Sequence, residues 1–317
     1  MIATVGRAAA LEGCLDSLAA QSHRPAEIIV VHSGGDPDTR ALCERDWPSR
    51  GLTVHYQSYP RKSAALQRDF AARRTAQPLL LFSDDDVEFE ADFIERLFDV
   101  LSRDAAIGAA MGRVVNHAMG EPTPLWRFYR HLVGGGDRAT VPGAVVGAMI
   151  PNGFPSGGSD PIRAEWLGGG TTLLRKTAYL SVNGFAPHHR GGSPGEDIDL
   201  GYRISRKWQV FYVPLARCVH HQSPAGREGV SRYQFLTVRS RYAFCRASAG
   251  LGATVSWVHL TVWAIFQTAS ELGQLRRGRL PAGFWAAVSG RVRGLWSCVG
   301  WDPAAEQFPD WHARHVA

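Results

Sequence analysis

Short apolar runs alternate with amphipathic segments across the first 82 residues, and this alternation limits the possible folds more than any other feature. The apolar runs occupy 1–5, 27–31, 53–56 and 79–82. The segments between them carry the spacing or the start signals of helices, and they occupy 8–20, 37–46 and the stretch that Ser63 would cap. Repeated strand–helix–strand units of this length build a parallel sheet covered by helices. The sequence therefore predicts an α/β fold.

The last apolar run leads directly into Ser83-Asp84-Asp85-Asp86. In open α/β sheets, ligands bind just beyond the carboxyl ends of the strands. Three adjacent carboxylates repel one another unless a cation neutralises them, and Mg²⁺ often joins carboxylates to substrate phosphates. The cluster therefore predicts a metal-diphosphate site and a nucleotide-linked substrate, with a solvated acidic turn as the alternative.

Composition is consistent with an anionic ligand. The chain of 317 residues has a formal net charge of +6, which favours a nucleotide, a phosphorylated substrate or an acidic membrane surface. No basic-aromatic module or recognition-helix signature points to nucleic acid. The five cysteines form no CxxC pair, so they support neither a disulfide framework nor a zinc site, and they fit a reducing cytosol. The N-terminus shows no basic segment followed by an apolar signal core.

Beyond the acidic cluster, a helix is expected around Phe93, Leu97 and Leu101, followed by a strand at 107–115. The Gly- and Pro-rich stretch 116–165 is predicted to be a long loop region near a site. A strand entered through glycines is expected at 166–174, a helix from Glu196, and a strand at 209–213.

The last part of the chain has a different composition. No charged residue lies between Arg246 and Glu271, but interspersed polar residues make this segment a poor transmembrane helix. Arginines and tryptophans then mix, at Arg276, Arg277, Arg279, Trp285, Arg291, Arg293, Trp296 and Trp301. This mixture is typical of a helix lying in a membrane interface. A buried helical cap and a membrane span are the alternatives.

A second set of motifs follows the acidic cluster. In order, these motifs are Asn183-Gly184-Phe185, Gly195-Glu196-Asp197-Ile198-Asp199-Leu200, Arg203 and, after a strand, His220. The whole arrangement resembles the family 2 glycosyltransferases with the GT-A fold over roughly residues 1–245. The resemblance implies a catalytic domain over 1–245 with a Rossmann-like, mostly parallel sheet flanked by helices. Residues 246–317 lie outside the resemblance and are expected to form a helical C-terminal region, whose arginine–tryptophan mixture favours contact with a membrane.

The resemblance also implies roles for individual residues. Asp86, Asp84 and His220 would hold Mg²⁺ or Mn²⁺, and the cation would stabilise the diphosphate that leaves a nucleoside-diphosphate sugar. The nucleotide sugar would also contact Asp84, Asp85, Lys62, Arg68, Gly169 and Gly170. Asp197 would be the base that removes the acceptor proton in an inverting transfer, with Glu196 supporting it or contacting the acceptor.

Three positions depart from the family pattern and leave the nucleotide base open. His32-Ser33 stands where the family often has an aspartate, Asp69 follows Arg68 where Asn is usual, and Ala186 follows Gly184-Phe185 in place of Asp. The expected acceptor is a lipid-linked saccharide or another cell-surface glycan precursor, met at the cytoplasmic face of the membrane. Three other functions stay open: a degenerate, non-catalytic binding protein, a sugar-phosphate nucleotidyltransferase, and a phosphatase with an aspartyl nucleophile.

Overall fold

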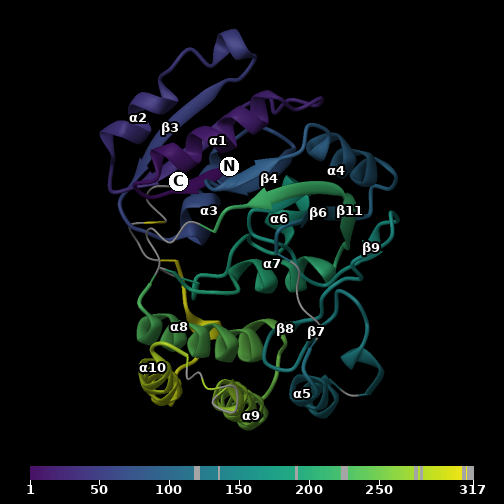
Figure 1. Cartoon of the computed structure of the whole chain (residues 1–317), viewed down its shortest axis with the longest axis vertical. Coiled ribbons are helices and arrows are strands. Elements are labelled where there is room, and N and C mark those ends of the chain that lie inside the picture. The colour runs from purple at the N-terminus through teal and green to yellow at the C-terminus, as the bar shows by residue number, and fades with distance from the viewer. Residues whose placement is uncertain are drawn as a thin grey trace.

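A sheet lies at one end of the molecule and a group of helices lies at the other (Figure 1). The computed structural model describes residues 1–117, 122–134, 136–189, 192–222, 228–274, 278, 281–308 and 312. The strands of the sheet follow the order β3-β2-β1-β4-β10-β6-β11-β5, with β9 paired to β11.

The N-terminal half of the sheet is parallel, as predicted. It contains β1 (Ile2–Thr4), β2 (Ile28–Ser33), β3 (Val54–Tyr59) and β4 (Leu79–Asp84). The connecting helices are α1 (Ala8–Ala19), α2 (Pro37–Cys43) and α3 (Ala64–Arg74). Leu11, Leu15 and Leu18 bury one face of α1 against the sheet. The Ser63 hydroxyl caps α3 by accepting the Leu66 N–H.

The second half of the sheet brings distant residues to the acidic cluster. It contains β6 (Ile107–Val114), β10 (Thr171–Arg175), β11 (Gln209–His220), β5 (Val87–Phe89) and β9 (Ile162–Arg163), with α4 (Phe93–Ser102) before β6. β10 runs antiparallel between β4 and β6. β11 is parallel to β6, and its end pairs antiparallel with β5. Because His220 pairs with Val87, this histidine lies next to the acids that precede β5.

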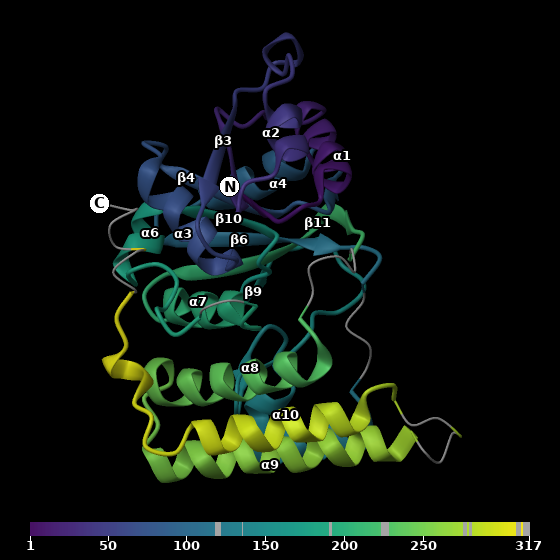
Figure 2. The same ribbon diagram turned by 90° about the vertical axis from the view of Figure 1, so that its left-hand side faces the viewer.

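Helix α6 (Lys176–Ser181) packs against β6 and β10. Four further helices lie below the sheet in Figure 1: α7 (Glu196–Ser205), α8 (Val230–Ala243), α9 (Ala253–Leu272) and α10 (Phe284–Ser297). Short helical turns cover Pro48–Arg50, Gly136–Ala139, Phe244–Ser248 and Pro303–Ala305. Figure 2 shows α9 and α10 running side by side beneath α8. Across the described residues, no helix combines the length and apolarity needed to cross a membrane.

The expected loop region contains a helix, so that part of the prediction is wrong. α5 (Pro124–Gly134) begins at a proline and is followed by the short hairpin β7 (Val145–Val146) and β8 (Ile150–Pro151). Aromatic packing explains the helix, because Tyr129 is fully buried and its ring lies 5.2 Å from Phe266 of α9. This partner is distant in sequence, and the local Gly- and Pro-rich composition gave no sign of it.

The division at residue 245 remains a proposal. α8 lies before that position, yet it packs closely on α10 through two glycines. A Cβ on Gly290 would lie 2.2 Å from the Ser231 carbonyl oxygen, and one on Gly294 would lie 2.7 Å from Val238 Cβ. We therefore group α8 with the helical region. Three arginines of the expected interfacial helix, Arg276, Arg277 and Arg279, lie outside the described residues.

His312, the last described residue, explains the unusual Asp69. His312 is fully buried, and its Nε2 lies 2.9 Å from Asp69 Oδ2. Arg73 donates to the same carboxylate over 2.7 Å and Tyr179 donates over 2.5 Å. Burial acts to raise the pKa of Asp69, but the bonds from His312, Arg73 and Tyr179 hold it below its usual value. The contacts of Asp69 are those of a structural anion that joins α3 to the C-terminal segment.

We expect His312→Ala to lower the free energy of unfolding by about 1–3 kcal/mol, because one partner of a buried carboxylate is lost. Urea unfolding measures this change. His55→Ala is the matched control, since that imidazole is half exposed and lies 3.8 Å from Glu27. Equal losses in the two variants would show that the Asp69 contact contributes nothing.

Candidate active site

Two aspartates and one histidine converge at the carboxyl end of β4. Oδ1 of Asp86 lies 3.1 Å from His220 Nε2, and Oδ2 of Asp84 lies 3.9 Å from the same nitrogen. One ligand atom from each residue falls within 4.8 Å of the others. Carboxylate oxygens suit Mg²⁺ and Mn²⁺, and imidazole adds a ligand that transition metals accept. The donor set therefore fits a divalent cation.

The middle acid of the cluster is directed elsewhere. Asp85 is fully buried; its Oδ2 accepts the Thr4 hydroxyl over 2.5 Å, and Arg7 lies 2.5 Å from its Oδ1. Burial raises the pKa of Asp85 to about 6, while Thr4 and Arg7 act against that rise. Arg7 also lies 3.4 Å from Asp86 Oδ2. Asp85 therefore holds Arg7 against the cluster, and any effect of Asp85 on a nucleotide sugar would pass through that arginine.

Sequence analysis did not identify Arg7 as a site residue. The sequence did contain a signal for Arg7, which closely follows the first apolar run. In the structure this run is β1, a parallel neighbour of β4, and Ala3 pairs with Asp84. Residues that follow β1 must therefore lie near residues that follow β4.

Arg68 connects the acidic cluster to the later Glu-Asp pair. Its side chain is 2% exposed, and its guanidinium forms an ion pair with Asp84. The same guanidinium lies 3.6 Å from Glu196 Oε1. The two acidic groups, more than a hundred residues apart in sequence, thus face one another across a single arginine. The carboxyl end of β4 and the N-terminus of α7 form two sides of one site.

Backbone amides hold Asp197 in place at the start of α7. Its Oδ2 accepts the Gly169 N–H over 2.8 Å, and its Oδ1 accepts the Ile198 N–H over 2.8 Å. Gly195, at φ +86, precedes the helix in a left-handed conformation that favours glycine. Both carboxylate oxygens are thus oriented by donors near a helix N-terminus, where negative charge is favourable.

Burial raises the pKa of both acids at this helix start. For Glu196 the charge of Asp197 adds to the rise and Arg68 opposes it. For Asp197 the hydrogen bonds from Ile198 and Gly169 oppose the rise. A carboxylate with a raised pKa accepts a proton more readily than an ordinary aspartate does. The pair has the chemistry of an acid–base group.

Gly169 and Gly170 line the space between the two acidic groups. A Cβ on Gly169 would lie 3.2 Å from both Arg68 Nη1 and Asp197 Oδ2. A Cβ on Gly170 would lie 2.5 Å from Asp84 Oδ2 and 3.0 Å from the Asp84 backbone nitrogen. The predicted strand at 166–174 begins only at Thr171, so these glycines precede β10 and let the backbone approach the acids.

We expect Gly170→Ala to reduce turnover by about a hundredfold, because the new methyl group would displace Asp84 and small misplacements at a reacting centre have effects of that size. Steady-state kinetics with saturating metal provides the measurement. Gly157→Ala is the control, since no atom lies within 4 Å of its added Cβ. Similar kinetics for both variants would contradict the close approach.

The other predicted residues are placed as follows. The Lys62 amino group lies 3.8 Å from the Glu228 carboxylate, and its side chain is 40% exposed. His32 accepts the Gly6 N–H over 2.9 Å at its Nε2. Burial lowers the pKa of His32, which favours the neutral ring that this bond needs.

A second group of metal-binding residue types lies beneath the site. His188, His189 and Asp199 offer ligand atoms within 4.8 Å of one another. Arg203 Nε, however, lies 2.9 Å from Asp199 Oδ2, and Ser248 donates to the other oxygen. Although burial acts to raise it, Arg203 and His189 hold the pKa of Asp199 far below its usual range. This aspartate already has a cationic partner, so its contacts are structural.

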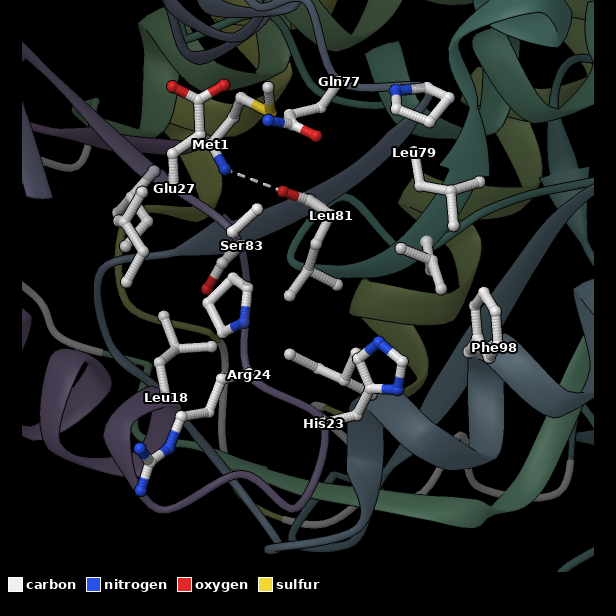
Figure 3. A pocket seen from close by; sticks show the side chains of 17 residues that line it. Met1, Leu18, His23, Arg24, Glu27, Gln77, Leu79, Leu81, Ser83 and Phe98 are labelled. Carbon is white, nitrogen blue, oxygen red and sulfur yellow. Dashed lines mark hydrogen bonds between the residues drawn. The ribbon is translucent and has the colours of Figure 1, made fainter. Parts of the chain in front are cut away.

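A separate, mostly apolar cavity is lined by Ser83 and Glu27 but by none of Asp84, Asp86, Glu196 and Asp197 (Figure 3). It has a volume of about 240 Å³ and is lined near the beginnings of β1 and β4 by residues such as Met1, Leu79 and Leu81. The Met1 amino group donates to the Leu81 carbonyl over 2.8 Å there. Since Asp84 and Asp86 do not line this cavity, it is not part of the site described above.

Comparisons with known proteins agree with this geometry. Residues 1–145 match the model of glycosyl transferase family 2. An N-acetylglucosaminyl-diphospho-decaprenol L-rhamnosyltransferase of Mycobacterium tuberculosis is 25% identical over 287 residues, which cover 85% of this chain and 91% of the relative.

Solved structures share the fold at low sequence identity. GalNAc-T7 with UDP, GalNAc and Mn²⁺ is similar with a TM-score of 0.57 and 16% identity over 81% of this chain, which spans only about half (53%) of that structure. The mannosyltransferase PcManGT from Pyrobaculum calidifontis, in complex with GDP-Man and Mn²⁺, is similar with a TM-score of 0.54 and 16% identity over 95% of this chain and 86% of that one. The family match over residues 1–145, the relative and the shared fold together support a family 2 glycosyltransferase with a GT-A fold.

Proposed function

We propose that this chain transfers a sugar from a nucleoside-diphosphate donor to a hydroxyl group of a lipid-linked saccharide, with inversion at the anomeric carbon. The observation that carries the proposal is the position of Arg68 between Asp84 and Glu196. In this proposal, Asp84 would lie on the side of the departing diphosphate. Glu196 and Asp197 would lie on the side of the incoming alcohol.

Asp84, Asp86 and His220 would hold Mg²⁺ or Mn²⁺. When bound, the cation would offset the negative charge that the leaving diphosphate gains. Mn²⁺ accompanies nucleotides in the two similar structures, which supports a divalent cation without choosing between the two ions.

Asp197 would act as the base. As the acceptor oxygen bonds to the anomeric carbon, the bond from that carbon to the diphosphate oxygen breaks, and the hydroxyl proton passes to the Asp197 carboxylate. The amides of Gly169 and Ile198 keep this carboxylate oriented. Glu196, paired with Arg68, would contact the acceptor or keep the arginine in position. Gly169 and Gly170 would face the donor sugar.

The relative from M. tuberculosis guides the choice of substrates to test. Its name describes an L-rhamnosyltransferase that acts on N-acetylglucosaminyl-diphospho-decaprenol. We therefore place nucleoside-diphosphate rhamnose first among donors and a polyprenyl-diphosphate N-acetylglucosamine first among acceptors.

The test is a donor panel followed by a transfer assay. Donors are screened by thermal stabilisation with Mg²⁺, with Mn²⁺ and with a chelator, since a ligand at a hundred times its Kd stabilises the folded state by about 2.7 kcal/mol. The best donor is then combined with the acceptor, and the anomeric configuration of the product is read by NMR. Metal-dependent binding without turnover would indicate a non-catalytic protein. A product that retains the donor configuration would refute the direct displacement by way of Asp197.

A further inference from the structure

Helix α9 exposes an apolar stripe on the side that faces away from the protein. Val255, Val258, Ile265 and Leu272 are 46%, 55%, 60% and 43% exposed. Their spacing of three and seven residues puts them on one face of the helix. A helix that only caps a domain normally presents polar residues on that face. The stripe therefore needs a partner other than the protein interior.

Two neighbouring helices continue this apolar surface. On and just after α10, Trp285 and Trp296 are each 74% exposed, Val292 is 47% exposed and Val299 is 62% exposed. On α5, Phe128 and Leu132 are 61% and 58% exposed, and the Phe128 ring stacks 6.0 Å from Phe266 of α9. We call these exposed side chains of α5, α9 and α10 the three-helix face. Figures 1 and 2 place the three helices together at the end of the molecule opposite the sheet.

The charged residues of α5, α9 and α10 themselves have a net positive charge. α5, α9 and α10 contain four arginines and one glutamate. That glutamate, Glu271, binds Arg291 over 2.6 Å and 2.9 Å. Arg127 and Arg293 are exposed. Arg127 also lines, with Arg130 and His131, a cavity of about 520 Å³ beside α5. The surface thus combines apolar side chains with a net positive charge.

We propose that the three-helix face docks on an anionic lipid bilayer, with Trp285 and Trp296 at the level of the headgroups. Exposed tryptophans beside arginines suit that interface, because the indole is apolar but keeps a polar N–H. A second copy of the chain would meet the same arginines, so like charges would face each other. The last described residues do not cover the face, because His312 is buried against Asp69. This inference does not depend on the donor or the acceptor.

Vesicle flotation of the full chain tests the proposal. We expect the protein to float with vesicles that contain phosphatidylglycerol, to bind phosphatidylcholine vesicles more weakly, and to lose binding as salt is raised to about 0.5 M, where surface charges are screened within a few ångströms. The double variant Trp285→Asn with Trp296→Asn is expected to bind anionic vesicles at least about tenfold more weakly. Phe128→Asn should weaken binding in the same direction, from a different helix.

The matched control is Leu180→Asn with Leu215→Asn, which removes two leucines that are 43% and 42% exposed on α6 and β11. It should bind as the wild type does, and thermal unfolding should show all variants folded. Wild-type protein that stays unbound with every vesicle, or a double tryptophan variant that binds equally well, overturns the proposal. A concentration-dependent dimer that the tryptophan substitutions abolish, without vesicle binding, would also overturn it and assign the face to a second copy.

Discussion

Replacing Asp86 by Asn should lower metal-dependent turnover by roughly a thousandfold. Asp86 lies 3.1 Å from His220 and is almost fully buried, so it is the best-placed member of the proposed metal-binding group. A catalytic cation contributes several kcal/mol of charge stabilisation, and each 1.36 kcal/mol is a factor of ten in rate. The measurement is kcat/KM against the concentration of Mg²⁺ and Mn²⁺, with thermal stabilisation by donor and metal as a readout that does not need turnover.

Glu88→Gln is the matched control for Asp86→Asn. Glu88 lies two residues further along, is half exposed and pairs with His221 over 3.0 Å. Both substitutions remove one negative charge from the same stretch of chain. The control should keep wild-type kinetics and wild-type metal dependence. An Asp86→Asn protein that still responds to metal as the wild type does would remove the proposed ligand role and leave the acidic cluster without a metal function.

The first half of the sheet could be predicted from the sequence because its elements are local. Each apolar run of residues 1–84 is short, and each intervening helix carries its own spacing or cap, such as Ser63 before α3. Once the strands are known to be parallel, their carboxyl ends meet at one edge, so the position of Asp84 follows. The Glu196-Asp197 pair could be assigned to the same site only through the order of motifs that resembles the family.

What could not be predicted depends on partners far along the chain. α5 is a helix because Tyr129 packs on α9, and its own Gly- and Pro-rich surroundings resemble a loop. Asp69 looked like a departure that concerned the nucleotide, whereas its carboxylate binds His312, which lies 243 residues away. Asp85 was expected to contact the nucleotide sugar together with Asp84, but it lies in the turn after β4, where its carboxylate binds Thr4 and Arg7. In each case the local residue pattern was compatible with two environments.

Replacing Asp197 by Asn should reduce transfer by about a hundredfold to ten-thousandfold while leaving donor binding intact, because general bases contribute that much to rate. The wild-type kcat/KM should fall as pH drops through the pKa of Asp197. Since burial raises that pKa, the fall should occur at a higher pH than for an ordinary aspartate. The measurements are a pH–rate profile for the wild type and donor affinity for both proteins.

The same substitution should not destabilise the fold. A carboxyl group whose pKa is raised in the folded state holds its proton more tightly there than in the unfolded chain, so it costs stability as pH rises above its unfolded pKa. Asp197→Asn removes this cost, but its amide nitrogen cannot accept the backbone N–H that one carboxylate oxygen now accepts, so the two effects oppose each other and the unfolding temperature at neutral pH should change little. Asp199→Asn, two residues along the same helix, should lower the unfolding temperature, since the pKa of Asp199 is lowered by Arg203 and His189. If Asp197→Asn lost turnover only together with stability, its role would be structural, and the base would have to be sought elsewhere in the site.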